Sequence, residues 1–242
     1  MPIPKWFLRA PAPDAEFRLF LFPYSGCGAS MFLKWPERIG GVELLPLQLP
    51  GRENRMREPH FGTYENLAVD LVDGISDYLD RPYGVFGHCG GALPAFESVL
   101  RVQELGLRPP ARCFLSSQVA PQDGPYGRFL GLSEEELRDE LRGLFGALGS
   151  ANPPADLVDL FMEVMTADVE ANRRYRKPAA GRAPCPLTAI GWDADVEVPY
   201  RLMDGWAKWA PTEDVLLPGT HYTFLDPPAA LLERLHADLT AG

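Results

Sequence analysis

The 242-residue chain lacks several features that mark whole classes of protein. It has no uninterrupted apolar run approaching the roughly 20 residues that a membrane span needs. Its four cysteines are scattered, with no C-x-x-C pair and no histidine at ligand spacing, so we expect neither a zinc site nor a disulfide framework. The 23 basic residues are outnumbered by 33 acidic ones, and no arm has a dense basic run, which argues against nucleic-acid binding.

The first residues also lack the charged-then-apolar pattern of a secretory signal, so we expect a cytoplasmic protein in reducing surroundings. With 46% hydrophobic and 23% charged residues, the chain can bury the core of one large domain. We therefore expect a single domain over residues 1–242, a monomer that needs no cofactor and no metal.

Short apolar runs bounded by turn residues predict six buried strands. These runs are residues 17–22, 42–49, 84–86, 112–119, 187–192 and 214–217. Helical patterns are found between and after them, from residue 31 onward and at 64–79, 92–105, 200–209 and 228–239. The alternation predicts an α/β fold, with a mostly parallel sheet and helices on both of its faces.

One long segment, residues 122–180, interrupts this alternation because it contains no strand pattern. Ser133 and Glu136 form a capping box that predicts the start of a helix, and a second helix is expected at 155–176. A loop rich in glycine, asparagine and proline is expected between them, at 146–154. We interpret the whole segment as a helical lid inserted over the active site.

The pentapeptide Gly-His-Cys-Gly-Gly at residues 87–91 is the most informative part of the sequence. It follows a predicted strand and precedes a predicted helix, as a nucleophile elbow does, in which a strained turn raises one side chain above the sheet. Glycines two residues before and after are needed because a Cβ there would clash with the doubled-back chain. The raised residue is Cys89, and the alternative is a small, inert, buried thiol.

A thiol nucleophile needs a base, and the base needs an acid that orients it. In enzymes with this elbow, the three catalytic residues occur along the chain in the order nucleophile, acid, histidine. His221 is the expected base, because its loop follows the last predicted strand, whereas His236 is expected to be a solvated or half-buried residue of the last helix. Asp193 and Asp195 both follow the strand that ends at residue 192, and the turn position favours Asp195 as the acid.

The chemistry also needs backbone N–H groups that stabilise an oxyanion. One belongs to Gly90, directly after the nucleophile, and another is expected in the loop 24–28 after the first strand. This glycine-rich loop does not match a dinucleotide-binding fingerprint, because the third glycine of that motif would stand at Met31.

Taken together, these motifs give a resemblance to the type II thioesterases that accompany polyketide synthases and nonribosomal peptide synthetases. The resemblance covers about residues 15–240. Its marks are LFPYSG at 21–26, LPGRENR at 49–55, GHCGGA at 87–92, LSEEEL at 132–137, CPL at 185–187, GWDAD at 191–195 and PGTH at 218–221. It implies an α/β-hydrolase with a helical lid that removes acyl groups from the phosphopantetheine arms of carrier proteins.

The resemblance also implies roles for single residues. Cys89, Asp195 and His221 would form the catalytic triad, and the amides of Ser25 and Gly90 the oxyanion hole. The family usually has serine at position 89, histidine at position 24 and a small residue at position 192, where this chain has Cys89, Tyr24 and Trp192.

The cysteine leaves three functions open. The first is hydrolysis of acyl or aminoacyl carrier thioesters through an acyl-Cys89 intermediate. The second is transfer of the group from one carrier to another, since acyl-Cys89 is itself a thioester of nearly equal energy, and some relatives with a cysteine nucleophile shuttle aminoacyl groups in this way. The third is a non-catalytic carrier-binding module. Lid side chains such as those of Phe129 and Met165 have two interpretations: they line an acyl pocket, or they only pack the lid helices together. The sequence does not identify the acyl group.

A carrier protein is usually acidic, and this chain has a net charge of −10, so docking is expected to need a local basic patch. One candidate patch is the loop with Arg52, Arg55 and Arg57. The other is the end of the second lid helix, where Arg174 and Arg176 are the residues we single out. The alternative is that these are ordinary solvated charges.

Overall fold

The computed structural model describes residues 3–147, 153–178 and 180–241. Seven strands form one sheet in the order β2-β3-β1-β4-β5-β6-β7, and only the short β2 pairs antiparallel to its neighbour. Their bounds are Phe17–Phe22 (β1), Arg38–Ile39 (β2), Val42–Pro46 (β3), Tyr83–His88 (β4), Arg112–Ser116 (β5), Leu187–Trp192 (β6) and Thr212–Leu217 (β7). The predicted α/β fold with a mostly parallel sheet is confirmed.

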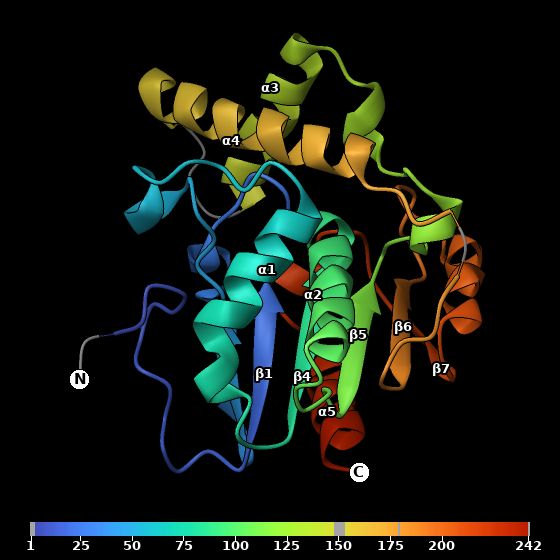
Figure 1. The fold of residues 1–242 in the computed structure, drawn as a ribbon. Coiled ribbons are helices and arrows are strands. Elements are labelled where there is room, and N and C mark those ends of the chain that lie inside the picture. The colour runs from blue at the N-terminus through green and yellow to red at the C-terminus, as the bar shows by residue number, and fades with distance from the viewer. Residues whose placement is uncertain (1–2, 148–152, 179, 242) are drawn as a thin grey trace.

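Helices cover both faces of this sheet (Figure 1). Helices α1 and α2 pack against each other on one face, and α5 lies on the other. The longer helices are Tyr64–Ile75 (α1), Ala92–Glu104 (α2), Glu134–Ala147 (α3), Ala155–Arg174 (α4) and Ala229–Thr240 (α5).

The core lies in two layers because successive strand residues point to opposite faces. Phe20 belongs to the hydrophobic cluster shared with α1 and α2, whereas its neighbours Leu19 and Leu21 belong to the cluster shared with α5. Both faces are buried along almost all of β1 and β4, which explains why these strands appear in the sequence as mostly apolar runs.

Some predicted elements differ from the structure. The helix expected from residue 31 is wrong: residues Ala29–Phe32 form a single 3-10 turn, and Pro36 soon afterwards disfavours a helical continuation. The strand at 112–119 ends at Ser116, because Ser117 has a φ of +44° and leaves the extended conformation. The helix near 200–209 is a 3-10 helix, Tyr200–Lys208. The loop predicted at 146–154 lies largely outside the described residues.

The segment between β5 and β6 contains no strand in its described part and includes α3 and α4. The capping box at its start is present: the Ser133 amide donates to Glu136 Oε2 over 2.8 Å, and the Glu136 amide donates to Ser133 Oγ over 3.3 Å. Figure 1 shows α3 and α4 above the carboxyl ends of the strands, the edge at which parallel sheets of this type place their reacting groups.

Candidate active site

Cys89 lies at the carboxyl end of β4 in a strained backbone conformation, with a φ of +48°. The turn is so tight that a Cβ at Gly87 would lie 2.2 Å from the carbonyl oxygen of Gly91. A Cβ at Gly91 would lie 2.7 Å from the carbonyl oxygen of Phe22 on the neighbouring strand. The two glycines therefore permit the turn that holds Cys89, and Cys89 itself is 8% exposed.

His221 and Asp195 come from the loops after β7 and β6 and lie in direct contact. The distance from His221 Nδ1 to Asp195 Oδ2 is 2.9 Å, and both side chains are buried. Asp193 has a different environment: it is exposed, and its Oδ1 accepts a 2.8 Å hydrogen bond from the Gly219 amide. Of the two aspartates, only Asp195 is in hydrogen-bond contact with His221 among the described residues.

The Asp195 carboxylate is held by more than the histidine. Its Oδ2 also accepts from Ser117 Oγ at 2.7 Å, and its Oδ1 accepts from the amides of Glu197 and Val198 at 2.8 and 3.0 Å. Burial raises the pKa of Asp195, but the hydrogen bond and charge of His221, together with these donors, lower it below its ordinary value. The carboxylate therefore stays ionised and fixes the orientation of the imidazole.

The other ring nitrogen of His221, Nε2, faces the nucleophile side of the site and forms no aligned hydrogen bond to a described residue. Burial alone lowers the pKa of His221; a negative charge on Cys89 and the hydrogen bond to Asp195 outweigh it and raise the pKa to about 10. The site is therefore electrostatically suited to hold His221 as an imidazolium. The absence of an aligned hydrogen bond at Nε2 is common in unliganded active sites, where catalytic hydrogen bonds tighten when substrate binds.

The side chain of His88, the residue before Cys89, packs in the core of the site. Its Nδ1 is 2.9 Å from Ser116 Oγ, and its ring stacks on Phe224 with a centroid distance of 3.8 Å. Complete burial lowers its pKa well below the ordinary histidine value, so the ring is neutral. Its neighbour His221 is therefore the titrating histidine beside Cys89.

A small cavity opens beside the nucleophile, with a volume of about 10 Å³. This is about the space that one water molecule needs. It is lined by Tyr24, Ser25, Cys89, Gly90, Gly127, Arg128, Phe129, Leu130, Val169, Asn172 and Glu197. Cys89 and both expected oxyanion-hole residues thus share one cavity with residues of the segment between β5 and β6.

The loop after β1 is held by α4 through a buried carboxylate, Asp168. The Gly26 amide donates to Asp168 Oδ2 at 2.8 Å, and Arg52 pairs with both carboxylate oxygens at 2.9 Å each. His60 Nε2 lies 2.7 Å from Asp168 Oδ1. Because the Gly26 amide is used here, the amide of Ser25 remains for an oxyanion: it makes no hydrogen bond to any described residue.

This network corrects one docking hypothesis. Arg52 and Arg55 are buried rather than solvated, so of the first candidate patch only Arg57 is exposed. Arg55 pairs with Glu58 and donates to the carbonyl of Gln48, which explains the second arginine of the P-G-R-x-x-R stretch as a loop-fixing residue.

The second candidate patch is on the surface. Arg174 and Arg176 are exposed at the end of α4, and Arg174 has one partner among the described residues, Glu170, at 3.6 Å. Arg176 donates to the carbonyl of Tyr175.

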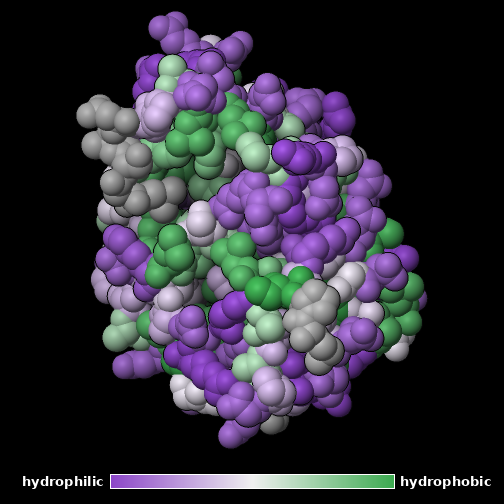
Figure 2. Space-filling view, turned by 90° about the vertical axis from the view of Figure 1, so that its left-hand side faces the viewer, coloured by the Kyte–Doolittle hydropathy of each residue, from purple (hydrophilic) through white to green (hydrophobic). Residues whose placement is uncertain are grey.

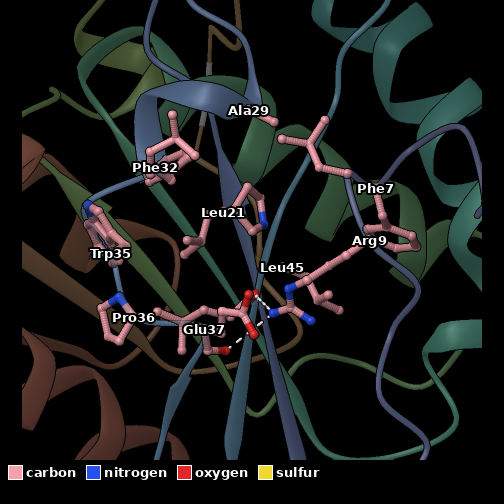
Figure 3. Close-up of a pocket in the computed structure, with 13 residues that line it drawn as sticks. Phe7, Arg9, Leu21, Ala29, Phe32, Trp35, Pro36, Glu37 and Leu45 are labelled. Atoms are coloured by element: carbon pink, nitrogen blue, oxygen red, sulfur yellow. Dashed lines mark hydrogen bonds between the residues drawn. The ribbon is translucent and has the colours of Figure 1, made fainter. Parts of the chain in front are cut away.

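A larger apolar cavity of about 290 Å³ lies elsewhere, between the N-terminal loop, β1, β3 and the turn at residues 29–32 (Figure 3). Phe7, Leu21, Phe32 and Trp35 line it, and Arg9 closes one side by donating to the carbonyls of Glu37 and Leu44 at 3.3 and 2.6 Å. None of the triad residues lines this cavity. Figure 2, which views that side of the molecule, shows hydrophobic surface broken up by hydrophilic side chains.

Several residues of the site were not expected from the sequence. Ser117 and Gln118 contact the triad, the first through Asp195 and the second by donating to the carbonyl of Cys89 at 3.3 Å. Glu197 lies two residues beyond Asp195 with its Oε2 3.5 Å from His221 Nε2. No motif marks these three positions, because each lies in a loop whose path is set by tertiary contacts.

The site combines a strained cysteine elbow, an Asp–His pair and a free loop amide at the carboxyl edge of a parallel sheet, which defines an enzyme of the α/β-hydrolase class. Residues 17–239 match the thioesterase domain family, and the chain belongs to that family. It is a thioester hydrolase.

Individual relatives agree with this assignment. The gramicidin S biosynthesis protein GrsT of Aneurinibacillus migulanus is 29% identical over 235 residues, covering 95% of this chain and 91% of its own. The RedJ thioesterase of the prodiginine pathway in Streptomyces coelicolor is 32% identical, with a TM-score of 0.79 and 95% and 96% of the two chains covered. The type II thioesterase BorB of the borrelidin cluster is 26% identical, with a TM-score of 0.82 and 99% of each chain covered.

The described residues contain neither a candidate metal site nor a candidate membrane span. Three or more His, Cys, Asp or Glu side chains are nowhere grouped so that they could hold a metal ion. No described helix is both long and apolar enough to cross a membrane.

Proposed function

We propose that this enzyme releases acyl or aminoacyl groups from the phosphopantetheine arms of carrier proteins in polyketide or nonribosomal peptide biosynthesis, with Cys89 as its nucleophile. The observation that supports this best is the position of Cys89: it lies on a strained elbow in one cavity with Ser25 and Gly90, next to the buried His221–Asp195 pair. The named relatives belong to biosynthetic pathways of this kind.

In the proposed first step, the Cys89 thiolate attacks the carbonyl carbon of the carrier thioester. The negative charge that develops on the carbonyl oxygen is stabilised by the amides of Ser25 and Gly90. The bond from carbon to the phosphopantetheine sulfur then breaks, and that sulfur takes the proton held by His221. The products are acyl-Cys89 and a free carrier thiol, and Asp195 keeps the imidazole oriented throughout.

In the second step, His221 removes a proton from water, which attacks the acyl carbon, and the bond to the sulfur of Cys89 breaks. A carboxylic acid leaves and the thiol is regenerated. The same step with an acceptor carrier thiol in place of water would transfer the group instead. The cysteine itself favours this second candidate function, because acyl-Cys89 and the carrier thioester contain the same type of bond.

The proposal includes the surroundings of the site. Residues 122–180 act as a lid within a single domain, supported by the position of α4, whose Asp168 holds the loop next to Ser25. The carrier docks on the exposed Arg174 and Arg176. The enzyme acts as a monomer in the reducing cytoplasm, which would keep Cys89 and the other free cysteines as thiols.

Intact-protein mass spectrometry tests the proposed cycle. We expect wild-type enzyme incubated with an acyl-carrier to show a mass increase that maps to Cys89, and Cys89→Ala to show none and to lose turnover. Cys89→Ser should hydrolyse if water is the natural acceptor, and should trap or divert the group if a carrier thiol is. Turnover above a few per cent of wild type in Cys89→Ala would remove Cys89 as nucleophile.

Docking is tested separately by charge reversal at Arg174 and Arg176. The double Glu variant should raise KM for carrier-bound substrate and weaken its salt dependence, while small acyl thioesters are cleaved as before. Charge reversal at Arg57, the exposed arginine of the other loop, is the matched control. An equal loss on both kinds of substrate would show that the lid is damaged and would end the docking proposal.

A further inference from the structure

The cavity beside Cys89 contains a carboxylate that the proposed cycle does not use. Glu197 lines this cavity, and its side chain is 7% exposed. Its Oε2 lies 3.5 Å from Nε2 of His221, the nitrogen that serves Cys89, and accepts no hydrogen bond from a described residue. A carboxylate on such a largely buried side chain is stabilised by a partner at its unpaired oxygen.

Two more acceptors line the same cavity. Asn172 donates its Nδ2 to the Tyr126 carbonyl at 3.4 Å, which leaves its buried Oδ1 without a partner among the described residues. The Tyr24 hydroxyl, on a side chain that is 1% exposed, lies beside that of Tyr222 without an aligned hydrogen bond. Carboxylate, amide and phenol oxygens together suit a group with several N–H donors and a positive charge.

The protein's own cations neutralise Glu197 only in part. Arg128 approaches Oε1 with Nη1 at 3.4 Å, but its side chain is 46% exposed and also pairs with Glu140. The facing His221 gives its proton to the leaving sulfur in the proposed first step, so its ring is neutral once Cys89 is acylated. After acylation, Glu197 therefore faces the cavity with one solvent-exposed cation as its partner.

We infer that Glu197 binds the α-ammonium group of an aminoacyl substrate, so that the enzyme selects aminoacyl thioesters over acyl thioesters that lack the amine. This rests on the proposed function of Cys89. The amine of an aminoacyl group is two bonds from the carbonyl carbon under attack. Glu197 lines the same cavity as Cys89, with its Oε2 3.5 Å from His221 Nε2. An uncharged acyl group of the same shape would leave the carboxylate unpaired, which disfavours its binding.

Two isosteric substrates test this inference: the alanyl and isobutyryl thioesters of N-acetylcysteamine, which differ by an ammonium in place of a methyl group. At pH 7, below the usual α-amino pKa of about 7.7–8.0, the alanyl amine is mostly protonated. We expect wild-type enzyme to prefer the alanyl thioester. Glu197→Gln should lower kcat/KM for it about 10- to 100-fold, the range for a hydrogen bond to a charged group, and leave the isobutyryl value unchanged or higher.

The ratio of the two kcat/KM values within one preparation does not depend on how much of a variant is folded. Glu140→Gln is the matched control, because it removes the other carboxylate next to Arg128 and does not line the cavity. It should keep the wild-type ratio. An equal loss on both substrates in Glu197→Gln, or a wild-type preference for isobutyryl, would refute the inference while the proposed function stands. Failure of the wild type to form acyl-Cys89 from either substrate would refute both.

Discussion

Asp168→Asn is the substitution for which the structure gives the sharpest expectation. The carboxylate is 4% exposed, and it joins α4 to Arg52 and to the loop at Gly26. Asparagine keeps the shape and one acceptor but removes the charge, which leaves the Arg52 guanidinium buried without a counterion. Breaking one partner of a buried ion pair costs about 3–5 kcal/mol.

Thermal and urea unfolding measure this cost. For a domain of this size, each kcal/mol shifts Tm by about 2–4 °C, so we expect Asp168→Asn to lower Tm by about 6–20 °C. Glu170→Gln is the control: Glu170 lies on the same helix, half exposed, and its replacement should change stability by less than about 0.5 kcal/mol. The double variant Arg52→Met/Asp168→Leu, which removes both charges, should recover much of the loss.

The same carboxylate gives a dependence on pH with a definite sign. Burial raises the pKa of Asp168, but the Arg52 charge and the His60 contact outweigh it and hold the pKa well below the ordinary aspartate value. Its stabilising contribution is therefore complete above the unfolded pKa of about 3.9 and is lost as the pH falls further. The stability gap between wild type and Asp168→Asn should be flat from pH 8 to 5 and narrow below about pH 4. A Tm for Asp168→Asn equal to that of Glu170→Gln would refute the reasoning.

Three further outcomes are expected at the triad. In a thioester-cleavage assay, Asp195→Asn should lower kcat about 10⁴-fold, because the imidazole loses the acceptor that orients it, whereas Asp193→Asn should stay near wild type. Similar modest losses in both variants would mean that neither aspartate is the acid. His221→Ala should abolish turnover and His236→Ala leave it nearly intact, and the reverse result would overturn the assignment of the base. Iodoacetamide should alkylate Cys89 faster than the other three cysteines, because Cys89 lies beside His221 whereas burial raises the pKa of the other three thiols; uniform labelling rates would favour an inert thiol.

The sequence predicts the frame of the fold because its signals are local. The runs at 17–22 and 187–192 are mostly apolar, with Arg18 and Thr188 as their polar residues, as expected of strands buried on both faces, and their bounds agree with β1 and β6. The elbow is equally local: Gly87 and Gly91 are required by contacts within one turn and the adjacent strand. Such features depend on neighbours in the chain and need no knowledge of the rest of the structure.

The parts of the site that the sequence does not predict depend on distant contacts. Arg52 and Asp168 are 116 residues apart, and nothing in either segment shows that the loop arginine is buried rather than solvated. Glu197 resembles any charged turn residue until the structure brings it to 3.5 Å from His221. The sequence likewise does not show that the Gly26 amide is occupied and the Ser25 amide free.

The choice between water and a carrier thiol in the second step depends on the charge of His221. In the proposed first step, His221 gives its proton to the leaving sulfur, and acylation removes the Cys89 charge, the largest influence that raises the pKa of His221, so His221 enters the second step as a neutral base. A carrier thiol gives up its proton to such a base far more readily than water, which is a much weaker acid. The cavity of about 10 Å³ has room for about one water molecule while it is closed. In the proposed cycle, the difference in acidity between the two acceptors and their access to this cavity together decide whether the group is hydrolysed or passed on.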